Sequence, residues 1–145
     1  MKELLYLQDA QLKELIEKLF ISYRESFADA KETLDRHSIG IAHHKVTHLL
    51  SMYEGITISA LLKKLKITKQ SLHRVLKDLV ELDAILFKKN QKDSRVKHII
   101  LSDKGKKLSE EIFLVQKKRI YKALLNSSAE EVLNFDNVLK KIINE

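Results

Sequence analysis

Residues 68–82 gather side chains that donate hydrogen bonds, and these residue types suit contact with DNA. Opposite an apolar stripe, the segment carries Lys69, Gln70, His73, Arg74 and Lys77. In a major groove, Gln pairs with the N6/N7 edge of adenine and Arg with the O6/N7 edge of guanine, each contributing about 1–3 kcal/mol of discrimination. The hydroxyls of Thr68 and Ser71, beside a helix N-terminus, suit phosphate oxygens. The alternative is an ordinary surface helix with a polar face.

A second group of cations follows in a polar, turn-forming stretch. Lys92, Arg95 and Lys97 lie at or beside its tip, where a long cationic side chain can enter a minor groove and sense its width. Asp93 precedes Arg95 by two residues and can orient its guanidinium through a bidentate ion pair. Asp93 can also cap the backbone of the loop in an Asx turn. The two roles are compatible.

The apolar periodicity predicts helices around these groups. A three-and-four spacing indicates a long amphipathic helix over residues 8–30 and a second helix from Ile41 to Tyr53, which Gly55 can end as a left-handed cap. We expect a short helix over 58–65 with Thr57 as its N-cap, a tight connection at 65–67, and a helix over 68–82 capped by Thr68. Two further helices are expected after Ser102 and after Ser128, which begins a capping box with Glu131.

The period changes between these helices. Residues 85–89 and 96–101 are short and rich in β-branched and aromatic side chains, with a polar turn between them, which predicts a β-hairpin. Short helix, turn, second helix and hairpin follow the winged helix-turn-helix plan. The expected fold is therefore mainly α with a small β-hairpin wing (85–101), in a single domain spanning 1–145.

The charge is concentrated on the same segment. The whole chain has 27 Lys plus Arg and 20 Asp plus Glu, a net charge of +7. Residues 58–107 hold 14 basic and five acidic side chains, a net of +9, so the rest of the chain is slightly acidic. A concentrated basic segment is typical of a surface that binds nucleic acid or an anionic membrane. A membrane surface is disfavoured because the cations lie opposite the stripe that anchors the helix, rather than beside an exposed one.

Composition excludes several other classes. The chain has no Cys, which excludes disulfides, Cys-ligated zinc and thiol chemistry, and three Gly, too few for glycine-rich nucleotide-binding loops. No apolar run approaches the roughly 20 residues of a membrane span, and the N-terminus lacks the long apolar stretch of a signal peptide, so we expect a cytoplasmic protein. No arrangement of Ser, His and Asp suggests catalysis, and we expect neither an enzyme nor a cofactor.

Three stretches resemble the MarR-type winged helix-turn-helix transcriptional regulators. They are Ile67-Thr68-Lys69-Gln70-Ser71-Leu72-His73-Arg74-Val75-Leu76, then Asp93-Ser94-Arg95, then Leu101-Ser102-Asp103-Lys104-Gly105. Residues 40–45 are also similar to a G-x-A-H-H-[RK] stretch of one branch. One departure is Lys66, where relatives often have Gly in the turn and where a left-handed backbone would cost Lys some free energy.

The resemblance implies a homodimer joined by N- and C-terminal helices (1–35 and 106–145) around a DNA-binding core (40–105). Such dimers bind pseudo-palindromic operators in double-stranded DNA, with the wing Arg, here Arg95, in the minor groove and Asp93 orienting it. Many members respond to a small effector, often an aromatic or anionic acid. Without Cys, a peroxide-sensing thiol switch is excluded, which leaves a reversible ligand as the signal.

Two features leave alternatives open. Apolar residues on the first and last helices suit an isologous dimer interface or a monomer core; they are Phe20, Tyr23, Phe27, Phe135, Val138, Leu139 and Ile142. His37, His43, His44 and His48 lie close in sequence, and His44 and His48 have the spacing that lets two imidazoles share a zinc ion. The rival functions are therefore a metal-responsive regulator and a winged-helix module that binds protein rather than specific DNA.

Overall fold

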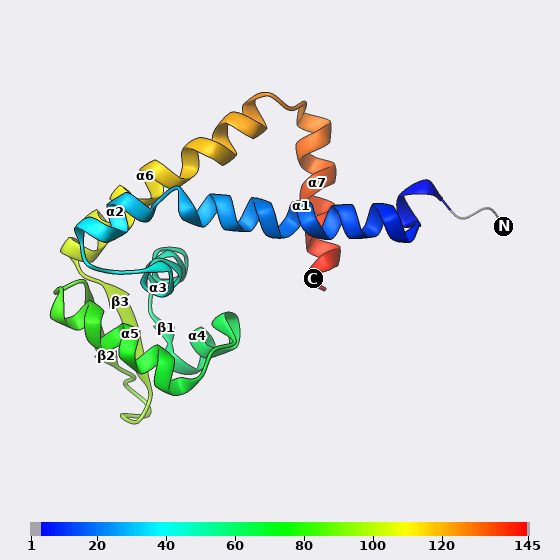
Figure 1. Ribbon diagram of the computed structural model, residues 1–145. Helices are drawn as coiled ribbons and strands as arrows, with labels where there is room; N and C mark the ends of the chain where they lie inside the picture. Colours follow the sequence, from blue (N-terminus) through cyan, green and yellow to red (C-terminus); the bar gives the residue numbers. More distant parts are fainter. Residues whose placement is uncertain (1–3, 145) are drawn as a thin grey trace. The chain divides into compact units, whose positions relative to one another are not determined.

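The computed structural model describes residues 4–144 and is mainly helical (Figure 1). The chain forms two compact units, one of Met1–Ser26 with Gln116–Glu145 and the other of Phe27–Val115. The elements in chain order are η1 (Leu5–Leu7), α1 (Asp9–Ala28), α2 (Lys31–Arg36), α3 (Ile41–Met52), β1 (Ile56–Thr57), α4 (Ile58–Leu65), α5 (Lys69–Glu81), β2 (Ile85–Lys89), β3 (Lys97–Leu101), α6 (Asp103–Leu125) and α7 (Ala129–Ile142).

The helix caps follow the sequence closely. The Thr57 hydroxyl accepts from the Ala60 N–H at 3.1 Å, and the Thr68 hydroxyl accepts from the Ser71 N–H at 3.0 Å. Ser128 and Glu131 form the expected capping box. Because each cap satisfies a backbone donor that would otherwise lack a partner, local sequence is enough to start these helices at the predicted residues.

The turn between α4 and α5 has the geometry that Gly would favour. Lys66 adopts a left-handed backbone, with φ 51° and ψ 44°, and its N–H donates to the Leu62 carbonyl. A side chain with a Cβ costs about 1 kcal/mol or more in this region. The helix-turn-helix therefore keeps its shape here with a strained Lys, held by the elements on either side.

Three local predictions need correction. The expected helix over 8–30 ends at Ala28, and a separate six-residue helix, α2, follows it because burial of Ala30 and Leu34 anchors the chain there. Gly55 does adopt a left-handed backbone, with φ 77°, but it lies in the turn after α3, whose C-cap is Tyr53. The second hairpin strand begins at Lys97, because the Val96 N–H turns back to the Asp93 carbonyl.

The sheet has three antiparallel strands in the order β1-β3-β2. The hairpin pairs Ile85 with Leu101 and Lys89 with Lys97, while β1 pairs Ile56 with Ile99. The sequence pattern does not predict β1, because a strand of two residues is too short to show a period. Its effect is to tie the chain before α4 to the base of the wing.

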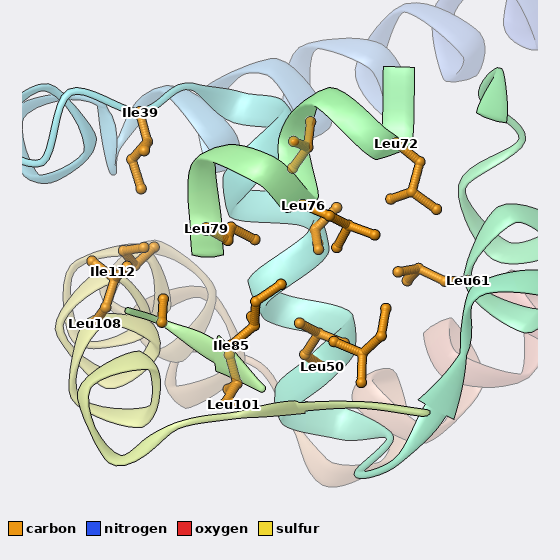
Figure 2. Packing of buried hydrophobic residues seen from close by; sticks show 14 of the residues in the cluster. Ile39, Leu50, Leu61, Leu72, Leu76, Leu79, Ile85, Leu101, Leu108 and Ile112 are labelled. Carbon is orange, nitrogen blue, oxygen red and sulfur yellow. The ribbon is translucent and has the colours of Figure 1, made fainter. Parts of the chain in front are cut away.

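The core of the Phe27–Val115 unit packs against one face of α5 (Figure 2). Leu72 and Leu79 of α5 are completely buried, as is Leu61 of α4. The other walls come from α3, the sheet and α6; among their residues are Leu50, Ile85, Ile99, Leu101, Leu108 and Ile112. Burying a Leu side chain contributes about 1.5–3 kcal/mol, so this stripe holds the donor-bearing helix firmly to the unit.

Gly105 allows the first turn of α6 to approach the backbone of Ala84 closely. A Cβ at this position would overlap the carbonyl oxygen of Ala84, which accepts the Ser102 N–H at 2.9 Å. The Ser102 hydroxyl in turn donates to the Asp83 carbonyl and accepts from the Gly105 N–H. Gly at position 105 thus lets the start of α6 lie directly against the residue preceding β2.

The other unit has little core of its own. Its helical residues come from α1, α6 and α7, and none of the described residues of α1 or α7 is buried. Large apolar side chains are half exposed, with Phe20 and Phe135 each at 55% and Ile142 at 49%. Apolar surface exposed to this extent is typical of a site of interaction with another surface.

Candidate nucleic-acid interface

The polar face of α5 is fully available to a partner. Its N-terminal end and outward side are exposed, comprising Thr68, Lys69, Gln70, Ser71, His73, Arg74 and Lys77. The Thr68 hydroxyl is occupied inside the cap, where it accepts from the Ser71 N–H and donates to the Ser71 hydroxyl at 2.8 Å. That leaves the Ser71 O–H free to donate outward, close to the positive end of the helix dipole.

The wing carries a preorganised arginine. The Arg95 side chain is 90% exposed, and its Nε and Nη2 donate to Asp93 Oδ1 at 3.1 Å and Oδ2 at 3.2 Å. The Arg95 N–H also donates to Asp93 Oδ1 at 3.0 Å, which is the Asx turn. Both predicted arrangements of Asp93 are therefore present together. The Arg95 side chain, followed by the Arg95 backbone N–H, holds the pKa of Asp93 below its usual value.

A groove of about 400 Å³ joins the two groups. It is lined by Lys69 and His73 of α5, by Arg95 and Lys97 of the wing, and by residues 57–59. Gln70, Arg74, Lys77 and Lys92 are exposed but do not line this groove. The arrangement offers a continuous surface of hydrogen-bond donors and positive charge, which matches a polyanion in chemistry.

Two residues of this region were missed by the sequence analysis. Asn90 Nδ2 lies 2.9 Å from His98 Nε2, and Asn90 Oδ1 accepts from the N–H groups of Lys92 and Asp93. His98 Nδ1 contacts the Gly55 carbonyl at 2.7 Å. An Asn directly after a strand signals a side chain that caps a turn, so Asn90 could have been found. His98 could not, because its partner Gly55 lies 43 residues away.

The histidines near α3 have separate partners. His37 Nε2 contacts Glu111 at 3.1 Å, and the ring of buried His44 lies 4.9 Å from the ring of Phe27. His43 Nδ1 accepts from the Gly40 N–H, so its Nε2 donates to Asp78 of α5 at 2.8 Å. Within residues 4–144, no three His, Asp or Glu side chains gather as metal ligands would. A metal-responsive site at His37, His43, His44 and His48 is therefore not favoured.

Among the helices described over residues 4–144, none combines the length and the apolar character that crossing a bilayer would require.

Comparison with known proteins gives one curated relative and many structural neighbours. The HTH-type transcriptional regulator PetP of Rhodobacter capsulatus is 35% identical over 140 residues, which cover 97% of this chain and 84% of PetP. Transcriptional regulators of this kind are not enzymes. No family model matches the chain.

The structural neighbours share the winged-helix fold. Wild-type MarR of E. coli in its apo form has a TM-score of 0.68 at 24% identity, covering 88% of this chain and 96% of MarR. A mutant of E. coli MarR, complexed with operator DNA, has a TM-score of 0.69 at 23% identity. The match covers 97% of this chain and 99% of the MarR mutant. Streptococcus pneumoniae FabT in complex with DNA has a TM-score of 0.72 at 19% identity. The match covers 92% of this chain and 95% of FabT. The curated relative shows that the chain belongs to the HTH-type transcriptional regulators, and the structural neighbours show that it has the winged helix-turn-helix fold of the MarR-type regulators.

Proposed function

We propose that this protein is a homodimeric regulator that reads a pseudo-palindromic operator through α5 and the wing of each subunit. The observation that carries the proposal is the groove in which Lys69 and His73 face Arg95 and Lys97. A major groove admits an α-helix, and a neighbouring minor groove admits a long cationic side chain. Operator DNA in the complex of the E. coli MarR mutant and DNA in the FabT complex support the proposal.

Each residue of the surface has a role in this proposal. Gln70 and Arg74 read base edges, and Arg95 enters the minor groove with Asp93 holding its guanidinium. His73 donates a hydrogen bond to the DNA. Phosphate oxygens are bound by the remaining donors, which are Lys69, Ser71, Lys77, Lys92 and Lys97. Thr68 contributes indirectly, because its hydroxyl positions Ser71 and the first turn of α5.

The proposed dimer uses the helices at the two ends of the chain. Within residues 1–35 and 106–145, side chains such as Phe20, Tyr23 and Phe135 are half exposed in a single chain. An isologous interface would cover them in both subunits at once. The same proposal assigns DNA binding to residues 40–105 and regulation to a reversible small effector of aromatic or anionic character.

Selection of duplexes from a random pool, followed by titration over a salt series, tests the proposal. We expect an enriched inverted repeat, and log K that falls linearly with log salt at about −0.9 per phosphate neutralised. Removing Arg74 should relax the selected sequence, whereas removing Lys77 should weaken all duplexes equally. A protein-interaction module is the competing function. It would be supported if no sequence were enriched and the α5 donors could be removed without effect.

A further inference from the structure

We propose that Asn90 and His98 are positioning residues that set the conformation of the wing loop, and that they do so only while His98 is neutral. The inference rests on the proposed role of the wing in DNA binding. Neither residue belongs to the predicted DNA-contacting set. Both are half-buried, whereas Arg95 is exposed.

The hydrogen-bond donors and acceptors fix the protonation of His98. The Gly55 carbonyl can only accept, so His98 Nδ1, 2.7 Å away, must carry a proton. Backbone N–H groups can only donate, so the Asn90 atom that meets Lys92 N at 2.8 Å and Asp93 N at 3.1 Å is the oxygen. The Asn90 amide nitrogen therefore points at His98 Nε2, 2.9 Å away, and donates to it. His98 Nε2 must accept, which requires a neutral imidazole.

Protonation of His98 would place two donors against each other. Nε2 would gain a hydrogen and face the Asn90 NH₂ group, so one of the two must turn away. If Asn90 flips its amide to offer the oxygen to His98, the N–H groups of Lys92 and Asp93 lose their acceptor. Those two N–H groups begin the loop in which Asp93 holds Arg95. The wing would thus lose order at the residues that present its arginine.

The charged residues next to His98 on the strands and in the turn before β1 are two lysines and one glutamate. Lys88 lies opposite His98 on β2, Lys97 is its neighbour on β3, and Glu54 precedes Gly55, while β1 contributes the uncharged Thr57. Helices α3 and α4 pack against β3, whose buried residues are Ile99 and Leu101. Lys and Glu side chains do not ordinarily titrate between about pH 5.5 and 8, whereas His does. We therefore attribute a change in the wing loop between pH 5.5 and 8 to protonation of His98.

Affinity for the selected operator, measured with the full-length protein at pH 8 and pH 5.5, tests the inference. His98→Gln supplies a donor and an acceptor that do not titrate, so we expect it to match the parent within about twofold at pH 8. At pH 5.5 it should bind roughly 3- to 10-fold more tightly than the parent. His73 also faces DNA in the proposal, but both proteins carry it, so its effect cancels in the ratio of their affinities.

For Asn90→Asp, we expect the pH dependence of operator affinity to be opposite to that of the parent. Its carboxylate would face the Nε2 lone pair at pH 8 but accept a hydrogen bond from a protonated His98 at pH 5.5. Its affinity relative to the parent should therefore rise by about tenfold on acidification. Gln91→Asp adds the same charge one residue away and should show no such rise. Equal pH profiles for the parent, His98→Gln and Asn90→Asp would overturn the inference.

NMR of the free protein separates this inference from the proposed function. At pH 8, the imidazole ¹⁵N spectrum should show the proton of His98 on Nδ1, and the amides of Lys92 and Asp93 should be protected, exchanging more slowly than unstructured amides at the same pH. A lower protection factor for those two amides at pH 5.5 than at pH 8, absent in His98→Gln, would support the inference even if no duplex bound. Equal protection factors at the two pH values, or a proton on Nε2 at pH 8, would contradict it. Failure of every variant to bind duplex would instead contradict the proposed function alone.

Discussion

Helices α5 and α7 both carry an apolar stripe, but the chain covers only one of them. On α5, Leu72 and Leu79 have no exposed surface. On α7, Phe135 and Ile142 remain 55% and 49% exposed, and no described residue of the helix is buried. The same periodicity therefore has two outcomes. One stripe attaches a helix to its own unit and leaves the polar face of that helix exposed, whereas the other stripe is itself exposed.

The largest effect is expected where the stripe is covered. Leu79→Ala should lower the free energy of unfolding by about 2–5 kcal/mol, because it removes buried methyl groups and leaves a cavity around α5. Chemical denaturation followed by circular dichroism measures the change. Leu133→Ala on α7 is the matched control, since Leu133 is 60% exposed, and should change the stability of the dilute single chain far less. Equal losses would remove the distinction between the two stripes.

Substitution on the uncovered stripe should instead change the assembly. Phe135→Ala should raise the dissociation constant of the proposed dimer by about tenfold or more, since large aromatic side chains dominate interfaces. Sedimentation equilibrium over a concentration series measures it. Tyr121 on α6 is 65% exposed, and the effect of its substitution on the dissociation constant can be compared with that of Phe135→Ala. A parent protein that sediments only as a 16.9 kDa species at micromolar concentration would contradict the dimer itself.

The polar faces of the two helices should differ in DNA binding. Arg74→Ala on α5 should cost about 1–3 kcal/mol of affinity for the selected operator and relax its sequence preference. Lys141→Ala on α7 removes one positive charge from an exposed position in the other unit and should have little effect. Fluorescence anisotropy with labelled duplex gives both values. If Lys141→Ala weakened binding as much as Arg74→Ala, α5 would not be the reading surface.

The smallest effect is expected at the start of α7. The Ser128 N–H and then the Ser128 hydroxyl hold the pKa of Glu131 below its usual 4.5. Because the pKa of Glu131 is lower in the folded state, its ionised carboxylate stabilises the fold at a pH above its unfolded-state pKa. That stabilisation is lost as the pH falls through its folded-state pKa. Ser128→Ala should bring the pKa of Glu131 nearer to 4.5, as NMR titration of its carboxyl carbon would show. An unchanged titration would mean that the capping box does not form in solution.

Much of the fold could be predicted because its signals are local. Thr57, Thr68 and Ser128 begin helices through bonds to residues three positions on, and those bonds are present at 3.0–3.1 Å. The pairing of Asp93 with Arg95 spans two residues and was predictable for the same reason. By contrast, β1 has only two residues, and its strand character comes from β3, more than forty residues later.

By itself, the sequence determined which segments are helices, which hairpin carries the wing, and where the positive charge is concentrated. These properties depend on apolar spacing, capping and composition, which act within a few residues. Only the tertiary structure decided which stripe is covered, that Lys69 and His73 face Arg95 and Lys97 across one groove, and that Asn90 and His98 connect the wing loop to Gly55. Those relations join residues far apart in the chain. Their free energy comes from packing and from satisfying buried polar groups, which no local pattern records.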